Sequence, residues 1–415
     1  MIIIVFLCVH LTTTFLIYKA APYPTDLDEH QHLSYALHMV QNPSFFADFP
    51  GMYEVDQNDL SAFTGPKVRL KHPTFYYFMI GLFADPVNLS LQENAKRLRL
   101  ANVAVSFLAV LILLVAGATV FREPEQLFAY TAVVALCPKI GVLGGMINND
   151  NLALLGAAIT TLGLAKLMRG RPTMAIALLI GGGFAIGALA KLTAGLILGF
   201  MVLFVHVIAV RKIFPLDRAK TTYLLCILVF VAVGVSQYVV NVYLYGSPIY
   251  PPTGREPIPE TERILLDPWH YLRWFLFVIG ERWATFRSDA GDYISLFLVM
   301  SLSILGTWHG MKATAQDPFH KRTALLAAIS LISAVIILAI NYGVAYRGHL
   351  ETGYLSGMHF RYYLPAWGGI AMGAALGLAA IPAGGWRKIT LLSLLGFLFY
   401  SHTVPLVANI LSDFF

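Results

Sequence analysis

The first candidate for chemistry is a polar run, Asp28-Glu29-His30-Gln31-His32, that follows an apolar N-terminal segment. Two adjacent carboxylates beside apolar surface lose hydration and repel one another, an environment that suits a general base. His30 and His32 could bind a metal, although an H-x-H pair is more often polar surface. The alternative for the whole run is an ordinary solvated loop.

Two further polar groups interrupt apolar segments. The run Asn148-Asn149-Asp150-Asn151 precedes an apolar helix, where Asp150 would also serve as a helix cap. Four polar residues are more than capping needs, and polar groups at membrane depth are costly unless they have a task. Lys191 stands alone in an almost continuous apolar stretch. Such a lysine either extends its amine to the membrane surface or meets an anion.

A fourth group lies in the last hydrophilic turn, where His359, Arg361 and Tyr362 precede Pro365. The planar guanidinium of arginine suits bidentate contact with phosphate. Tyrosines at this place are also typical of the boundary between lipid and water. Arg361 is harder to explain in that way, because it stands at the start of an apolar helix with His359 close by.

The composition shows what must position these residues. Of 415 residues, 57% are hydrophobic and only 13% are charged, about half the charged fraction of a soluble protein. The chain is therefore expected to be an integral membrane protein of the all-α class. The three cysteines have no spacing typical of a zinc site or of disulfides. Basic residues form no continuous stripe, so nucleic acid is not an expected partner.

A helix needs about 20 apolar residues to cross a bilayer, and about 11 segments qualify. They are 2–19, 100–121, 126–145, 150–168, 173–190, 192–210, 221–244, 292–310, 323–343, 363–381 and 389–410. The aromatic run 73–84 would reach only about 18 Å as a helix, so we interpret it as an interfacial helix. Residues 1–415 then form a single transmembrane domain with large external loops at 20–99 and 245–291, and shorter external turns that include 344–362.

The charges of the short connections predict the orientation. With the N-terminus inside and 73–84 not crossing, one set of connections carries 13 of the 29 basic residues. The positive-inside rule makes that side cytoplasmic. The four polar groups then lie together on the extracytoplasmic face, and the inner (plasma) membrane is the expected location. The 13 residues are Arg122, Lys166, Arg169, Arg171, Arg211, Lys212, Arg218, Lys220, Lys312, Lys321, Arg322, Arg387 and Lys388.

The chain has no phosphate-binding loop of the G-x-x-x-x-G-K-[ST] type, no G-x-G-x-x-G, no G-x-S-x-G and no H-E-x-x-H. Their absence argues against an ATP-driven pump, an enzyme with its own nucleotide domain, an α/β-hydrolase and a zinc protease. Carboxylates and fixed cations on one membrane face could instead bind a lipid-linked phosphate and activate a hydroxyl. That combination suits transfer of a sugar from a polyprenyl phosphate.

The ordered set of motifs resembles the GT-C superfamily of integral membrane glycosyltransferases, in particular the protein O-mannosyltransferase and aminoarabinose transferase branch. The order of the matching pieces covers most of the chain up to residue 365. The pieces are Asp28-Glu29 with His32, His72-Pro73-Thr74-Phe75-Tyr76-Tyr77, Arg97 or Arg99, Asn149-Asp150, Gly187 to Lys191, and Arg361-Tyr362-Tyr363-Leu364-Pro365.

The resemblance implies an inverting transferase with a polyprenyl-phosphate-linked sugar donor and a glycan, lipid or protein acceptor. It implies catalytic roles for Asp28, Glu29 and Asp150, with Asp28 as the base. It places Lys191, Arg361 and Arg99 at the donor phosphate. The remaining residues expected in the site are His32, His72, Asn149, Tyr362 and His359.

Other functions fit parts of the same pattern. A transporter or flippase of lipid-linked saccharides would also place cations near a lipid phosphate, but transporters usually bind near the midplane of the membrane. A polymerase or ligase of surface polysaccharide would share the chemistry with a pyrophosphate-linked donor. No cofactor is firmly expected. A divalent cation is left open, although Asn148-Asn149 stand where a metal site of the oligosaccharyltransferase kind would have a second acidic pair.

Overall fold

The computed structural model describes residues 1–21, 23, 28–44, 52–56, 63, 72–210, 218–248, 257–281, 290–312, 318–355 and 359–412. These residues are helical or irregular, apart from one isolated antiparallel bridge between Val55 and Phe63. The all-α class is thereby confirmed. Ser61, Lys67, Trp283, Arg287 and Ser356 lie outside the described residues.

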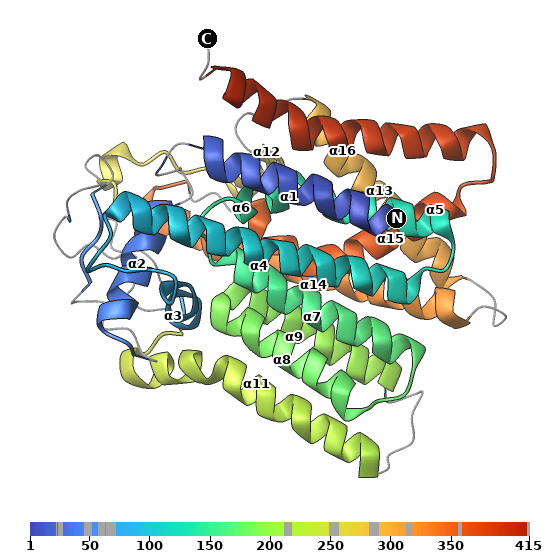
Figure 1. Cartoon of the computed structure of the whole chain (residues 1–415), viewed down its shortest axis with the longest axis horizontal. Helices are drawn as coiled ribbons and strands as arrows, with labels where there is room; N and C mark the ends of the chain where they lie inside the picture. The colour runs from blue at the N-terminus through green and yellow to red at the C-terminus, as the bar shows by residue number, and fades with distance from the viewer. Residues whose placement is uncertain are drawn as a thin grey trace.

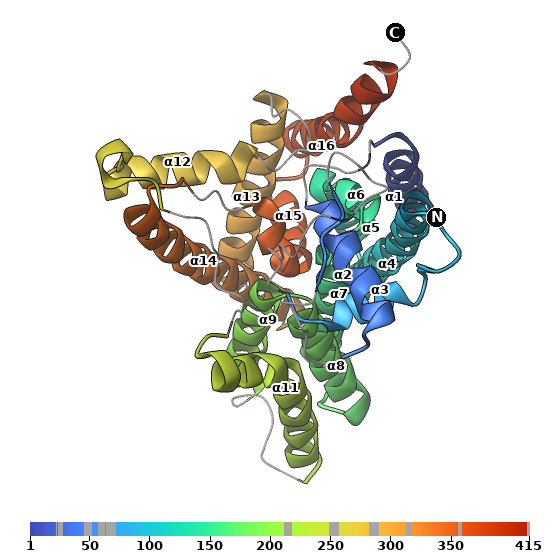
Figure 2. The same cartoon turned by 90° about the vertical axis from the view of Figure 1, so that its left-hand side faces the viewer.

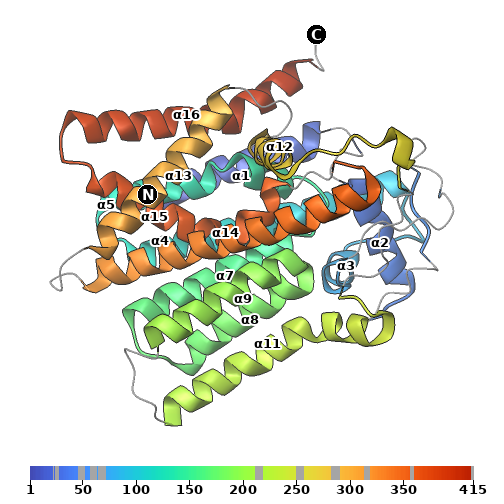
Figure 3. The same ribbon diagram turned by 180° about the vertical axis from the view of Figure 1, so that it is seen from behind.

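Long helices lie side by side and occupy each of the predicted apolar segments (Figures 1 and 3). They are α1 (Ile2–Ala20), α4 (Leu91–Val120), α5 (Pro124–Ala135) with α6 (Pro138–Gly144), α7 (Asp150–Arg169), α8 (Met174–Ala190), α9 (Leu192–Val205), α11 (Arg218–Tyr245), α13 (Ala290–Met311), α14 (Pro318–Thr352), α15 (Trp367–Ala380) and α16 (Gly385–Ser412). A π-helical turn, η2 (His206–Val210), continues α9.

Within the described part of the chain, seven helices are each long and apolar enough to cross a membrane. The α5–α6 pair passes the same test as one bent span, while α8 and α9 are shorter apolar helices. The chain is an integral membrane protein by these features. The number of 11 crossings stays a prediction.

Two predicted segments differ in shape from a simple span or loop. Segment 126–145 is broken between α5 and α6, which meet at 49°, because Pro138 lacks an N–H and its ring disfavours a helical residue before it. Helix α14 continues to Thr352, so much of the predicted turn 344–362 is helical. Hydropathy detects only the apolar part of such a helix and misses the more polar residues that continue it.

Short helices gather at one end of the bundle, which faces the viewer in Figure 2. They are α2 (Glu29–Gln41), α3 (Phe75–Gly81) and α12 (Pro268–Glu281), with the 3₁₀ turns η3 (Glu260–Glu262) and η4 (Phe360–Ala366). Helices α2 and α3 pack on the start of α4 through a buried cluster that includes Leu33, Tyr35, Tyr77 and Leu98. We call this the α2–α3 end.

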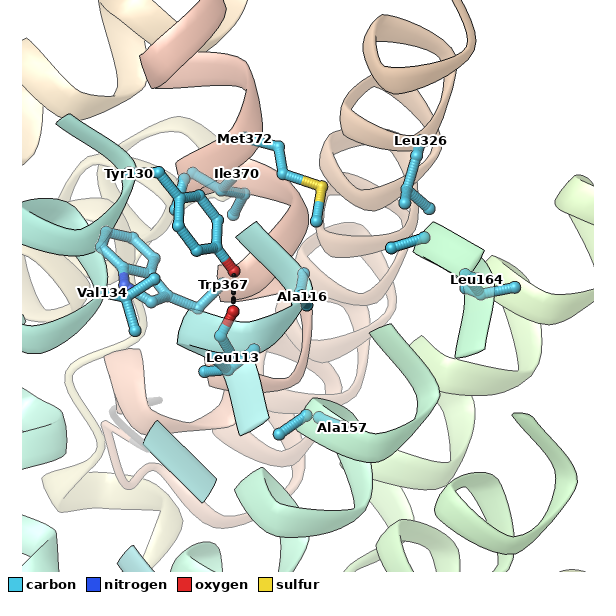
Figure 4. Close-up of a cluster of buried hydrophobic side chains, with 14 of the residues drawn as sticks. Leu113, Ala116, Tyr130, Val134, Ala157, Leu164, Leu326, Trp367, Ile370 and Met372 are labelled. Atoms are coloured by element: carbon cyan, nitrogen blue, oxygen red, sulfur yellow. Dashed lines mark hydrogen bonds between the residues drawn. The ribbon is translucent and has the colours of Figure 1, made fainter. Parts of the chain in front are cut away.

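The main core joins α4, α5 and α15 (Figure 4). Tyr130 donates a hydrogen bond to the carbonyl of Leu113 over 2.8 Å, and the indole of Trp367 donates to the carbonyl of Val133 over 3.1 Å. Buried Tyr and Trp need such partners for their polar atoms. These bonds fix α15, and with it the preceding turn η4, against the centre of the bundle.

Small residues bring α7 and α8 into backbone contact. A Cβ added to Gly156 would lie 2.4 Å from the backbone nitrogen of Gly187, and one added to Gly183 would lie 2.6 Å from that of Thr160. Helices in a membrane approach this closely only where side chains are missing. Because α7 and α8 run antiparallel, the contact brings Asp150, which begins α7, beside Lys191, which follows α8.

The predicted basic connections lie together at the opposite end of the bundle. There α4 and α7 end, α8, α11 and α14 begin, and α15 turns into α16 (Figure 1). Arg211 and Lys212 lie outside the described residues. The arrangement agrees with the charge argument, while the side that faces the cytoplasm stays a prediction.

Candidate active site

Asp28 stands at the start of α2 in a conformation that non-glycine residues seldom adopt. Its φ is +60° and its ψ is +24°, in the left-handed region. Its carbonyl accepts the first backbone bonds of α2, yet its carboxylate makes no cap bond to the helix. Aspartate adopts left-handed backbone more readily than most non-glycine residues, but Asp28 also lacks a cap bond, which would contribute about 1 kcal/mol. Unusual backbone together with a carboxylate that does not cap its helix is typical of functional positions.

Glu29, the next residue, is completely buried and fully bonded. Its two carboxylate oxygens accept hydrogen bonds of 2.7 and 2.6 Å from Nε and Nη2 of Arg99. The backbone N–H of Ile147 donates to the same carboxylate over 3.0 Å. Nη1 of Arg99 donates to the carbonyl of Ala21 over 2.9 Å. This closed pair joins α2, α4 and the segment before Asp150.

Asp150 and Lys191 form a second buried ion pair, with 2.7 Å between Nζ and Oδ1. Lys191 is in extended backbone between α8 and α9, so its side chain leaves the helical stack and reaches the start of α7. Asn149 holds the two segments together, because its Nδ2 donates to the carbonyl of Ala190 over 2.8 Å. Asn148 accepts a bond of 2.9 Å from the backbone of Asp150.

Arg361, in η4, lies between the two aspartates. Its Nη2 is 3.6 Å from Oδ2 of Asp28, and its Nε is 3.5 Å from Oδ2 of Asp150. Both distances exceed those of a good charge-assisted hydrogen bond. The ring of Tyr362 lies 4.3 Å from Nζ of Lys191 and 5.7 Å from Cζ of Arg361. His359 packs edge-on against that ring.

Two histidines of the α2–α3 end lie next to these cations. The imidazole of His32 shares a hydrogen bond of 2.9 Å with the hydroxyl of Tyr77 and stacks on His72 with ring centres 6.1 Å apart. Burial, assisted by the nearby imidazole and by Arg361 and Lys191, lowers the pKa of His32 well below 6.5. Burial and the same two cations lower the pKa of His72. Both rings are therefore neutral near pH 7.

The site contains buried polar atoms that lack a hydrogen-bond partner among the described residues. The donors are Nδ2 of Asn148 and Nε and Nη1 of Arg361, and the acceptors are Oδ1 of Asn149 and Oδ2 of Asp150. Buried polar atoms are normally satisfied, and each exception calls for an explanation. A ligand that carries both acceptors and donors, such as a sugar phosphate, would satisfy them.

Two of the proposed metal ligands have other partners. His30 pairs with Glu54 at 3.0 Å, and His32 bonds Tyr77. Among the described residues, no three His, Cys, Asp or Glu side chains converge as a metal site. The divalent cation left open by the sequence remains untested.

The structure thus gathers Asp28, Asp150, Lys191 and Arg361, with Asn149, Tyr362, His359, His32 and His72 around them, while Glu29 and Arg99 pair with each other. Sequence analysis did not identify Asn102. Its Oδ1 accepts bonds from Tyr76 (3.1 Å) and Asn151 (3.0 Å), and so joins α3, α4 and α7. The sequence did offer a signal for Asn102, because it is an asparagine within the predicted apolar span 100–121.

Comparisons with known proteins agree with this fold. No protein-family model matches the chain, and no curated protein matches its sequence. Among solved structures, the ArnT of Cupriavidus metallidurans is similar with a TM-score of 0.54 and 14% identity, over 95% of this chain and 62% of that one. The Archaeoglobus fulgidus oligosaccharyltransferase is similar with a TM-score of 0.52 and 14% identity, over 98% of this chain and 56% of that one.

This chain shares the fold of these two proteins and has a GT-C-like fold. It spans about three fifths of their length. At 14% identity the likeness shows the fold alone.

Proposed function

We propose that the chain is a membrane glycosyltransferase that moves a sugar from a polyprenyl-phosphate donor to a hydroxyl of a glycan, lipid or protein acceptor, with inversion, on the extracytoplasmic face. One observation carries the proposal: a half-exposed carboxylate, Asp28, lies within 4 Å of a buried arginine that still has N–H groups without partners. A base and an anion site are thus adjacent at one end of a membrane bundle.

In the proposed reaction, Lys191 and Arg361 bind the donor phosphate. The bond between the anomeric carbon and the phosphate oxygen breaks, and the phosphate gains negative charge as it leaves. Cations held in a buried site stabilise this developing charge more than the charge of the intact donor. Tyr362 packs against both cations and limits their movement.

Asp28 takes the acceptor's proton as the acceptor oxygen bonds to the anomeric carbon. The products are the glycosylated acceptor, the free polyprenyl phosphate and a protonated Asp28, which later loses its proton to water. Asp28 suits this role because its side chain is 48% exposed. Asp150 is only 3% exposed and is held by Lys191, so we assign it the positioning of both cations.

The environments of Asp28 and Glu29 support the choice of Asp28 as base. Every carboxylate oxygen of Glu29 is bonded to Arg99, and no surface of its side chain is exposed. A proton-transfer group has to come within hydrogen-bond reach of the substrate. We therefore propose that Glu29 and Arg99 hold the start of α2 and the Ile147–Asp150 segment in place, and that Arg99 does not bind the donor.

A transfer assay tests the function. Purified protein in lipid nanodiscs is incubated with isolated cell envelope and labelled polyprenyl-phosphate donors that carry glucose, mannose or a pentose. We expect label to enter the envelope with release of polyprenyl phosphate. Asp28→Asn should lower the rate about 10²- to 10⁴-fold, while Asp267→Asn, at an exposed carboxylate just before α12, should not. Movement of the donor between leaflets without transfer would contradict the proposal.

A further inference from the structure

Arg361 and Arg99 meet carboxylates in different ways. The guanidinium of Arg99 is saturated, with bonds of 2.6 to 2.9 Å to Glu29 and Ala21. The guanidinium of Arg361 has contacts of 3.5 and 3.6 Å with two aspartates, and its Nε and Nη1 lack hydrogen-bond partners. Since buried N–H groups without hydrogen-bond partners are costly, Arg361 has the stronger tendency to accept another anion.

The two aspartates near Arg361 are held with different strength. Asp150 is buried and is fixed by Lys191 at 2.7 Å. Asp28 is half exposed and makes no cap bond to α2. Water reaches the carboxylate of Asp28, and its 3.6 Å contact with Arg361 is longer than a good charge-assisted hydrogen bond. Asp28 is therefore the aspartate that a competing anion would displace.

A lipid phosphate is a strong competitor for this position. It offers several acceptor oxygens in a geometry that matches the guanidinium fork. Its binding would satisfy Nε and Nη1 of Arg361, which Asp28 does not.

We infer that Arg361 holds Asp28 in a masked state, and that the donor phosphate displaces Asp28 from Arg361 and thereby frees the base. The inference rests on the proposed function, in which Asp28 is the base and Arg361 binds the donor. It adds an order to the reaction: the donor binds first, and only then can an acceptor hydroxyl lose its proton. If an acceptor binds before the donor, Asp28 is still paired with Arg361 and does not take the acceptor's proton.

The masking predicts that loss of the proposed base improves lipid binding. Farnesyl phosphate, a lipid monophosphate without a sugar, serves as the probe, and its affinity is measured by calorimetry on protein in nanodiscs. Asp28→Asn should bind it about threefold to fivefold more tightly than the unmodified chain, because no carboxylate competes for Arg361. Asp28→Ser serves as a second variant if Asp28→Asn does not fold.

Removal of any negative charge near the site could also improve anion binding, so two controls separate the effects. Glu351→Gln removes an exposed carboxylate of α14 that pairs with Arg347, and we expect no change in affinity. Asp28→Asn is then measured in an Arg361→Gln background. Masking requires that its effect disappears there, whereas a general electrostatic effect would persist.

The outcomes distinguish the inference from the function on which it rests. If the unmodified chain and Arg361→Gln bind farnesyl phosphate equally or not at all, the proposed donor site is wrong. If Arg361→Gln weakens binding but Asp28→Asn leaves it unchanged, or improves it equally in both backgrounds, masking alone is wrong. Inorganic phosphate as a second probe should show the same pattern, since Arg361 recognises the phosphate and not the lipid.

Discussion

Glu29 and Asp28 are neighbours in sequence, but their side chains have opposite environments. Glu29 is sealed against Arg99 and the backbone of Ile147, while Asp28 points away from its helix toward Arg361. The sequence suggested catalytic roles for both residues through the resemblance, with Asp28 as the base. It did not identify the partners, because Arg99 lies 70 positions from Glu29 along the chain and no local pattern reports such a contact.

The closed pair makes a prediction about stability. Arg99→Ala leaves the carboxylate of Glu29 buried without a counter-charge, and breaking a buried ion pair from one side costs about 3–5 kcal/mol. We expect a clear fall in the unfolding temperature of Arg99→Ala in detergent micelles. Arg347→Ala, which breaks the exposed pair with Glu351, is the matched control and should leave that temperature unchanged. Equal shifts in the two variants would show that the Glu29–Arg99 pair has no special structural role.

The two stacked histidines predict how stability changes with pH. Folding lowers the pKa of His32 and His72 below the unfolded value near 6.5. Between the folded and unfolded pKa values, the unfolded chain binds more protons than the folded one, so stability falls as the pH drops below about 6.5. Above that pH neither state is protonated, and this contribution is constant.

His32→Gln should reduce the loss of stability between pH 7 and pH 5, because the folded chain then has one fewer buried imidazole that stays neutral while its unfolded counterpart is protonated. The slope that one such group can contribute is about 1.4 kcal/mol per pH unit. Thermal unfolding at several pH values measures it, and His270→Gln, at an exposed histidine of α12, is the control. A His32→Gln curve parallel to that of the unmodified chain would contradict the prediction.

At the scale of elements, the sequence predicted where helices form more reliably than where they end. Apolar segments are a local property, so each predicted span coincides with a helix or a bent pair. The break between α5 and α6 follows from Pro138, and the extension of α14 to Thr352 lies beyond its apolar stretch, so hydropathy showed neither. The site depends on contacts between elements: Asp150 and Lys191 meet because α7 and α8 touch through glycines.

Adjacent glycines of α8 test that contact. A Cβ at Gly183 would lie 2.6 and 2.7 Å from backbone atoms of α7, whereas a Cβ at Gly182 would have nothing within 4 Å. Gly183→Ala should therefore push α7 and α8 apart and destabilise the chain by about 1–3 kcal/mol. It should also weaken lipid phosphate binding, because Lys191 moves from Asp150. Gly182→Ala should retain stability and binding. A neutral Gly183→Ala would mean that the close approach is not required.

At the scale of the whole molecule, the candidate site and the predicted cytoplasmic connections lie at opposite ends. The candidate site lies at the α2–α3 end, and the short connections used in the charge count lie at the other (Figure 1). Charge counts predicted this separation, since orientation depends on the sum over short loops. They could not predict that Asp28 and Arg361 meet, because residues 333 positions apart in the sequence are brought together only by the packing of the bundle.

The positive-inside rule assigns the α2–α3 end to the extracytoplasmic side, where a lipid-linked sugar would have to be met. Asn88, exposed between α3 and α4, and Arg171, exposed between α7 and α8, mark the two ends. In intact cells, a membrane-impermeant maleimide should label Asn88→Cys, while Arg171→Cys should react only after permeabilisation. The native cysteines are retained in both variants and in the unmodified control, which sets the background. Labelling of Arg171→Cys from outside, with protection of Asn88→Cys, would invert the orientation and place the candidate site on the cytoplasmic face.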